Sequence, residues 1–438
     1  MKNTKLLTTV ILICLIVFGA FALLLADTDG GKQEYDTALK QAEDYMKREL
    51  YQLAIAEYDK AIAIDDSTEL RDAVLNAYEK RYEESTTIID DYILAAESAV
   101  SAFPKEEEYY IILAKVYGRN DNYQAAYKAL GNAKNNGVKS EKIDDLYIDV
   151  KYAFETKWYT YTGFNPCVSG LYPVTNSEIW GYIDETGDSK TGFDYTFASQ
   201  LGEEGIRILC AEKNMLEDEN GIVRGKLSFV PTAAGTYSEG FIAIKNGEKF
   251  GYYDSLGDHK FGAYIAASNF TNGKAAVSEK DGEWYFIDTN GKKTSDTKYQ
   301  DINLNLDGSY LKNGIMFAKS DGKYKIYDKD GKRVGSFECD DIDVITDDGI
   351  IAFKKNDKWG FVDTTGKVIV EAKFDNAKSF SNGLAAVCQG EKWGFADKDG
   401  TVVIDCQFFD ADYFNSKRNC LVKSTPGDWQ MIALKVNF

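Results

Sequence analysis

Seven aspartates recur along the second half of the chain, each followed three residues later by a glycine, and neighbouring copies lie 34 to 40 residues apart. The aspartates are Asp184, Asp218, Asp254, Asp288, Asp328, Asp363 and Asp397, and the glycines are Gly187, Gly221, Gly257, Gly291, Gly331, Gly366 and Gly400. Carboxylates in short loops are ligands that Ca²⁺ prefers, and two copies read DKDG, like the start of a calcium-binding loop. Such a loop also needs further oxygen ligands and a terminal Glu at a fixed spacing, and neither copy supplies them.

A structural role explains all seven pairs without a metal. The Asp side chain caps a tight turn by accepting hydrogen bonds from backbone amides, and Gly adopts the positive φ angle that such turns require. We therefore expect these residues to close β-hairpins, and we expect neither a metal ion nor another cofactor.

Little in the sequence favours an enzyme. The single histidine, His259, lies in the polar stretch GDHKFG, which leaves almost no basis for a His-containing triad, zinc site or proton shuttle. The chain lacks the G-x-S-x-G, H-E-x-x-H and phosphate-binding glycine-rich motifs. A glycosidase needs only a pair of carboxylates, but turn caps and solvated surfaces account for the many Asp and Glu residues. We expect no catalytic activity.

The seven cysteines are dispersed and form no Cys-x-x-Cys pair. They are Cys14, Cys167, Cys210, Cys339, Cys388, Cys406 and Cys420. We expect free thiols that pack as small apolar side chains, and three disulfides are the alternative if the region lies outside the cytoplasm.

The composition indicates a folded, acidic protein with two or three domains. The chain has 438 residues, of which 44% are hydrophobic and 13% aromatic, enough to build packed cores. Its formal net charge of -19 favours solubility and disfavours binding to nucleic acid or to anionic lipid. We therefore expect no nucleic-acid partner.

The beginning of the chain has the pattern of a membrane anchor. Residues 6–26 form an uncharged stretch of 21 residues, long enough to cross a hydrocarbon core of about 30 Å. Lys2 and Lys5 precede it, and Asp27 and Asp29 follow it, which places the bulk of the chain outside the cytoplasm. We expect a cytoplasmic tail over 1–5, a single transmembrane helix over 6–26, a linker over 27–34 and a location at the cell membrane. A cleaved signal peptide is the alternative.

Residues 35–156 are predicted to be helical, because Gly and Pro nearly vanish and Ala, Glu, Lys, Leu and Tyr dominate. Small Ala126 and Ala133 follow the turn RNDN, so that paired helices can approach closely. The stretch resembles a tetratricopeptide repeat. Tyr45, Ala54, Tyr58 and Ala61 fit the same template, and Ala96, Ala99 and Pro104 mark a degenerate unit between them. The resemblance implies an α-solenoid whose concave face binds peptides; an ordinary helical bundle is the alternative.

A second repeated position precedes each Asp by four residues and is aromatic in six of the seven units. It holds Trp180, Phe250, Trp284, Tyr324, Trp359 and Trp393, and Asn214 in the second unit. An apolar run such as GLAAV comes before it, and another such as KVIV follows the Gly. We expect each unit to be an antiparallel meander of three strands that stacks on its neighbours, with the repeated aromatic residue packed between them.

These units resemble the WG-repeat family of bacterial proteins. The Trp-Gly pair stands at 180–181, 359–360 and 393–394, with Phe-Gly at 250–251, whereas the second, fourth and fifth units lack the Gly. The resemblance covers 163–438 and implies a β-repeat domain but no defined activity. We expect a multidomain α plus all-β protein whose β domain is propeller-like, with about seven units, and a frayed eighth copy that starts at Asp428. An open β-solenoid is the alternative.

The predicted function is that of a membrane-anchored interaction scaffold that binds a protein or an envelope component. A carbohydrate-binding or glycan-processing surface protein is the alternative. Two stretches interrupt the repeat pattern, 158–166 with Tyr161 and 303–313 with Tyr310. Because loops that break a pattern often carry binding, these are the candidate ligand contacts.

Overall fold

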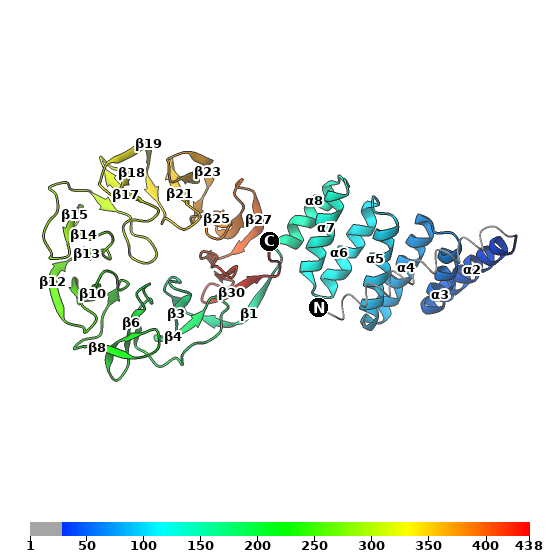
Figure 1. Ribbon diagram of the computed structural model, residues 1–438, viewed down its shortest axis with the longest axis horizontal. Coiled ribbons are helices and arrows are strands. Elements are labelled where there is room, and N and C mark those ends of the chain that lie inside the picture. Colours follow the sequence, from blue (N-terminus) through cyan, green and yellow to red (C-terminus); the bar gives the residue numbers. More distant parts are fainter. Residues whose placement is uncertain (1–28) are drawn as a thin grey trace. The chain divides into compact units, whose positions relative to one another are not determined.

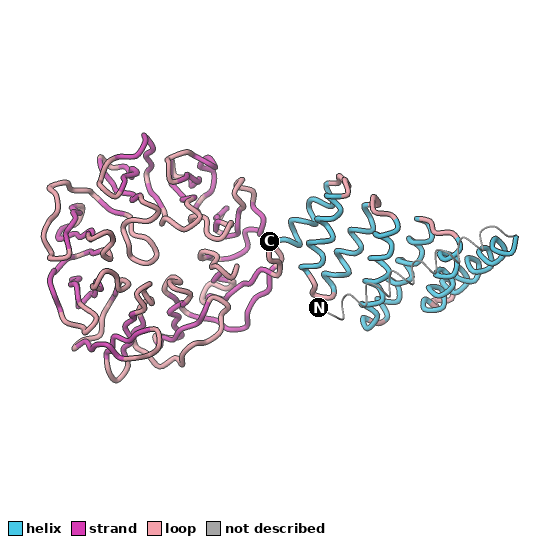
Figure 2. The backbone as a smooth tube through the Cα atoms, in the orientation of Figure 1, coloured by secondary structure: helices cyan, strands magenta, loops and turns pink. Residues whose placement is uncertain are grey.

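The computed structural model describes residues 29–438, and these divide into a helical unit and a β unit. The helical unit contains the described residues up to Ala153 together with Lys435–Phe438, and the β unit is Phe154–Leu434. Figure 1 shows the helices of the first unit, and Figure 2 shows the strands of the second arranged in a ring.

Residues 29–153 contain seven α-helices and one short 3-10 helix. They are α2 (Asp29–Lys47), α3 (Tyr51–Ile64), α4 (Thr68–Glu84), η1 (Thr86–Ile88), α5 (Ile89–Ala102), α6 (Glu107–Arg119), α7 (Tyr123–Asn135) and α8 (Glu141–Lys151). Each α-helix packs against the next one along the chain. Small side chains allow this close packing, since Ala54, Ala61, Ala126 and Ala133 are fully buried.

The β unit consists of eight small antiparallel sheets within the described residues, and we call them blades 1 to 8. In blades 1 to 7 the strands follow one another in chain order, and the first strand of each blade has only two residues.

The first four blades have the following strands. Blade 1 has β2 (Gly163–Phe164), β3 (Leu171–Asn176) and β4 (Ile179–Asp184); blade 2 has β5 (Phe197–Ala198), β6 (Ile206–Cys210), β7 (Asn214–Asp218) and β8 (Val223–Leu227); blade 3 has β9 (Ala233–Ala234), β10 (Ile242–Asn246), β11 (Lys249–Tyr253) and β12 (His259–Tyr264); blade 4 has β13 (Ala266–Ala267), β14 (Lys274–Lys280) and β15 (Glu283–Asp288).

The last four blades have four strands each. Blade 5 has β16 (Asp301–Ile302), β17 (Ile315–Ser320), β18 (Lys323–Asp328) and β19 (Arg333–Cys339); blade 6 has β20 (Asp341–Ile342), β21 (Ile350–Lys355), β22 (Lys358–Asp363) and β23 (Val368–Phe374); blade 7 has β24 (Asn376–Ala377), β25 (Ala385–Gln389), β26 (Lys392–Ala396) and β27 (Val402–Phe408); blade 8 has β28 (Asp410–Ala411), β29 (Asn419–Lys423), β30 (Trp429–Leu434) and β1 (Phe154–Tyr161).

Blade 8 closes the ring, because it combines strands from both ends of the β unit. β1 pairs with β30 in antiparallel register, with Phe154 opposite Leu434 and Glu155 opposite Ala433. The β unit is therefore a closed propeller, and its first and last repeats have no open sheet face. The prediction of a propeller is confirmed, and the open solenoid is excluded.

The predicted number and composition of the units are wrong. The sequence predicts about seven three-stranded units, whereas the described chain has eight blades, six of them with four strands. The copy at Asp428, predicted to be frayed, lies in a complete blade because β1 supplies its fourth strand. The two-residue strands escape prediction because so short a strand shows no alternation of apolar and polar residues.

No helix within residues 29–438 is long and apolar enough to cross a membrane. The predicted anchor over 6–26, with the tail over 1–5, lies outside the described residues. Within residues 29–438 the fold class is therefore corrected to seven α-helices followed by an eight-bladed propeller. The transmembrane helix, and the single-pass location at the cell membrane that depended on it, are not supported by the structure.

Candidate functional site

All seven repeated aspartates cap the turn that follows the third strand of a blade. In blade 6, Oδ1 of Asp363 accepts hydrogen bonds from the amides of Thr365 at 2.9 Å and Lys367 at 3.0 Å. The same two bonds form in the other six units. In residues 29–438 no group of three or more His, Cys, Asp and Glu side chains is placed to hold a metal ion. The carboxylates serve the backbone of their own turns.

Six of the seven repeated glycines, all except Gly221, let these turns lie close against the preceding blade. All have φ between +74° and +88°, which favours Gly. A Cβ atom at Gly366 would lie 2.7 Å from Cβ of Phe337 in blade 5, and one at Gly400 would lie 2.7 Å from Cγ1 of Val370 in blade 6. A Cβ atom at Gly257 would likewise lie 2.3 Å from the carbonyl oxygen of Lys226 in blade 2. The turn is thus a joint between neighbouring blades.

The Gly of the Trp-Gly pair makes room for the outer strand of its own blade. A Cβ atom at Gly360 would lie 2.5 Å from O of Val370, and one at Gly394 would lie 2.3 Å from O of Ile404. The aromatic side chains before these glycines are only partly buried. Trp284 and Tyr324, in two units without the Gly, are 9% and 7% exposed.

The side chains that join the blades most directly lie two positions after the repeated aromatic residue, and they were not predicted from the sequence. The ring of Phe361 in blade 6 lies 4.7 Å from that of Phe380 in blade 7, and Phe395 in blade 7 lies 4.7 Å from Phe414 in blade 8. The equivalent residues are Tyr182, Leu216, Tyr252, Phe286 and Ile326, all buried. An apolar residue recurs at this position in every unit, which is the signal that could have identified them.

The loops that follow the two-residue strands converge on a cavity of about 320 Å³ at the centre of the ring. The longest of them, 303–313, projects toward the middle of the propeller in Figure 1. Gln200 of blade 2 donates to O of Leu306 at 2.8 Å, and Thr236 of blade 3 donates to O of Asp307 at 2.9 Å. This loop, which the sequence analysis proposed for ligand contact, therefore bridges blades through its own backbone.

A partly buried cluster of charged and polar groups joins blades 6, 7 and 8 beside this cavity. The hydroxyl of Tyr413 donates to both carboxylate oxygens of Asp343 at 2.8 Å, and the amide of Ser379 donates to Oδ2 of Asp343 at 2.6 Å. Nζ of Lys378 in blade 7 lies 3.8 Å from Oδ1 of Asp412 in blade 8. Burial raises the pKa of Asp412 to about 6, although Lys378 acts in the opposite direction.

The helical unit contains a groove between α4 and α6 with a volume of about 540 Å³, which we call the α4–α6 groove. Tyr92 and Tyr109 are buried in its floor. Arg119 donates to Oε1 of Glu79 at 2.8 Å across the groove, and this bond lowers the pKa of the Glu79 carboxyl. Asp72, Asn76 and Lys115 also line the groove, and their side chains are exposed.

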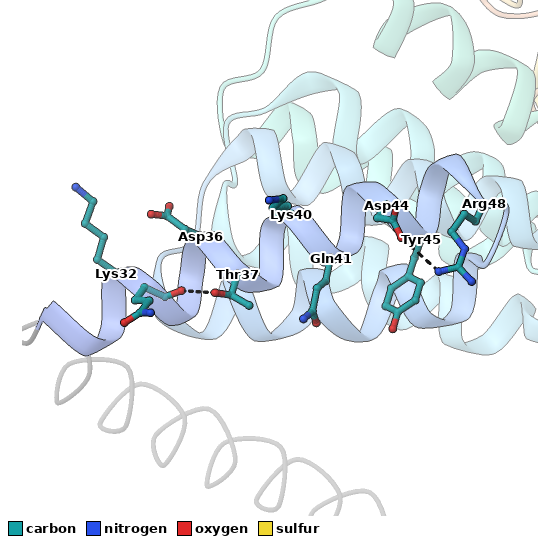
Figure 3. Close-up of a pocket in the computed structure, with 9 residues that line it drawn as sticks. Lys32, Asp36, Thr37, Lys40, Gln41, Asp44, Tyr45 and Arg48 are labelled. Carbon is teal, nitrogen blue, oxygen red and sulfur yellow. Dashed lines mark hydrogen bonds and ion pairs between the residues drawn. The ribbon is translucent and has the colours of Figure 1, made fainter.

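A larger hollow of about 860 Å³ runs along α2 (Figure 3). Eight of the nine described residues that line it belong to this one helix, and the ninth, Arg48, directly follows the end of the helix at Lys47. Two of its contacts are local hydrogen bonds, from Thr37 to O of Gln33 and from Arg48 to Oδ2 of Asp44. One polar helix face does not enclose a ligand, so this hollow is the weaker candidate.

The two tyrosines proposed for ligand contact are buried. Tyr161 is 6% exposed and Tyr310 is 2% exposed, and the hydroxyl of Tyr310 donates to O of Thr271 at 3.1 Å. The neighbouring Trp158 and Tyr159 are 95% and 73% exposed. Between the pairs Thr156–Ile432 and Thr160–Gln430 the register of β1 shifts, and this bulge turns both rings to solvent.

The six cysteines in the described part of the chain are free thiols. Burial raises the pKa of Cys167 to about 12, so this thiol is protonated and poorly reactive. His259 is exposed at the start of β12, with one ring nitrogen 3.1 Å from O of Gly262.

A comparison with protein families supports the WG repeat in part of the β unit. The family described as WG containing repeat matches residues 326–359, 359–393 and 393–418. No curated protein matches the chain. Among solved structures, BamB from Moraxella catarrhalis is similar to this chain, with 12% identity, a TM-score of 0.45, and coverage of 64% of this chain and 100% of BamB.

Two similar helical structures are tetratricopeptide domains. The TPR2B domain of yeast Sti1, in a complex with pHsp70, has 19% identity and a TM-score of 0.22, and the match covers 27% of this chain and 96% of that domain. The Sgt2 TPR domain from Aspergillus fumigatus has 18% identity and a TM-score of 0.23, covering 29% and 80%. These identities and TM-scores are too low to carry an argument about function.

The close contact between the Asp-x-x-Gly turn and the preceding blade predicts how much stability is lost when the glycine is replaced by alanine. Gly366→Ala should lower the free energy of unfolding by about 3 kcal/mol or more, because the left-handed backbone and the contact with Phe337 both oppose a Cβ atom. Gly383→Ala is the matched control, since Gly383 has φ of +87° but open space around it, and it should cost only about 1–2 kcal/mol. Equal losses in urea unfolding would contradict the docking role.

The buried carboxyl of Asp412 predicts a pH dependence of stability. Its pKa is about 6 in the folded protein and about 3.9 in an unfolded chain. Between these values the folded protein binds more protons, so this group makes stability fall as pH rises, by about 2–3 kcal/mol in total.

Asp412→Asn should therefore gain about 2–3 kcal/mol relative to the wild type between pH 4 and pH 8, as measured by urea unfolding at several pH values. Asp399→Asn, at an exposed turn position, is the control and should follow the wild-type curve. If the Asp412→Asn and wild-type curves run parallel, the buried carboxyl is not the titrating group.

Proposed function

We propose that this protein is a protein-binding scaffold without catalytic activity, and that the α4–α6 groove holds a segment of a partner protein. The groove itself carries the proposal. Its floor is aromatic, with Tyr92 and Tyr109 buried below a rim of exposed polar groups. Aromatic surface beside a few polar groups is typical of protein-binding sites.

The exposed groups of the groove can bind a peptide backbone and its charges. Asn76 on α4 offers both an amide donor and a carbonyl acceptor, and Lys115 on α6 offers a cation. Asp72 adds a negative charge on the α4 side. The ion pair of Glu79 with Arg119 fixes two further side chains, so less conformational entropy is lost when a partner binds.

The propeller supports a scaffold role in a different way. Its central cavity is lined in part by the loop 303–313, whose backbone is held by blades 2 and 3. The outer faces of the blades are available for contacts with partners. Broad surfaces on closed repeat folds suit protein recognition.

Photo-crosslinking from the groove tests the proposal. A photoreactive residue at Asn76 of the full chain should crosslink one reproducible partner in cells, identified by mass spectrometry. The same residue at Asp90, exposed on α5 outside the groove, is the matched control and should not. Adding Lys115→Glu should reduce the Asn76 crosslink about tenfold. Identical products from both positions would refute the groove as the binding site.

Carbohydrate binding is the second candidate, and it is supported by the exposed rings of Trp158 and Tyr159. Adjacent exposed aromatic side chains can stack on the apolar faces of sugars. Trp158→Ala should abolish binding on an array of bacterial and host glycans, whereas Leu94→Ala, at an exposed position of α5, should leave it unchanged. A wild-type protein that binds no glycan would eliminate this candidate.

A further inference from the structure

The segment Lys435–Phe438 lies against α7 and α8 of the helical unit. Val436 is 0% exposed and belongs to the same apolar cluster as Tyr110 of α6 and Leu130 of α7. Lys435 forms an ion pair with Asp121 just before α7. Its main-chain amide donates to O of Ala153 at 2.9 Å.

The contacts of this segment are those of an extended peptide in a binding site. Gln124 of α7 satisfies both main-chain groups of Asn437: its Oε1 accepts from the amide at 2.9 Å, and its Nε2 donates to the carbonyl at 3.4 Å. Such a pair of bonds holds a backbone whatever its side chain is. The neighbouring positions supply specificity, because the side chain of Val436 is buried and Phe438 carries an aromatic ring.

The ring of Phe438 has its own partners at the end of α8. Its centroid lies 5.4 Å from that of Tyr152, and Nζ of Lys151 lies 4.3 Å above it. Tyr127 of α7 lies on another side, with its centroid 6.2 Å away. The recognised pattern is a cation, a β-branched apolar residue, a residue held by its backbone, and an aromatic ring.

Part of this segment remains exposed to solvent. Only one of the four side chains is fully buried, Phe438 remains 41% exposed, and the Asp121 side chain of the ion pair is 73% exposed. A separate segment of this size would bind weakly. Its covalent connection compensates by giving an effective concentration of about millimolar order.

We propose that α7 and α8 form a second peptide-binding site, which Lys435–Phe438 occupies in cis, and that a partner segment with the same pattern of residues displaces it. This site is separate from the α4–α6 groove, and the proposal does not depend on that groove. Regulation follows directly, because a partner gains access only when the chain's own segment is released.

A competition experiment tests the displacement. Val436→Asp in the full chain puts a charge into the apolar cluster and releases the segment. The probe is an amidated Leu-Lys-Val-Asn-Phe peptide with a fluorophore at its N-terminus, followed by fluorescence anisotropy. The variant should bind the probe at least tenfold more tightly than the wild type, whose site is filled. A probe with Asp in place of Val should bind neither protein.

Two controls test whether tighter binding of the probe comes from release of Lys435–Phe438. Val223→Asp makes the same exchange at an exposed position of β8, 45% exposed, and should bind the probe no better than the wild type. Hydrogen exchange of α7 and α8 should speed up in Val436→Asp and slow again when the probe is added.

Three results would overturn the proposal. The first is equal affinity of the probe for the wild type and Val436→Asp, or no binding at millimolar probe. The second is a loss of α7 and α8 protection that the probe does not restore, because the segment is then an irreplaceable part of the helical core. The third is a wild-type dimer that exchanges its segments, which identifies a second copy as the occupant.

Discussion

The Asp-x-x-Gly turn that docks on the preceding blade is the contact on which the ring depends. The carboxylate of Asp363 fixes the turn by accepting two backbone amides, and Gly366 brings that turn against Phe337 of blade 5 without a Cβ atom between them. A meander of three or four short strands cannot bury both of its faces alone. Each blade is therefore stable only when it packs against its neighbours. The Asp-x-x-Gly turn and the aromatic contacts hold neighbouring blades together.

Ring closure follows from the same constraint. A chain of blades that each need a neighbour leaves two unsatisfied ends unless the ends meet, and blade 8 joins them through the pairing of β1 with β30. On the inner side, Tyr413 of blade 8 also donates a hydrogen bond to Asp343 of blade 6. A closed ring is well suited to presenting surfaces, which is the role proposed for this protein.

The repeats predicted much of the β unit because they are short-range signals. The spacing of Asp363 from Gly366 identified a tight turn, and the alternation around Trp359 identified a strand; both features lie where the sequence placed them. The number of blades could not be read in this way. It depends on β1, whose partner β30 lies more than 260 residues further along the chain, and no local pattern reports such a pairing.

The candidate sites were less predictable than the fold. Tyr310 lies in a loop that interrupts the repeat, which made it a ligand candidate, yet it is buried against Phe286 of the neighbouring blade. Exposure depends on the tertiary structure, so the sequence could not separate Tyr161, which is buried, from Trp158, which is exposed. The groove between α4 and α6 and the site of Lys435–Phe438 also depend on helices packing in a particular order.

Native-state hydrogen exchange of the full chain, read by mass spectrometry, tests the central claim that the β unit is one closed ring. In a closed ring, amides of β1 and β30 should be protected as strongly as those of β17 and β18, because every blade has two neighbours. In an open array, the end repeats unfold before the middle ones. Protection that declines steadily from blade 5 toward both ends of the β unit would contradict the closed propeller and the joint proposed to hold it.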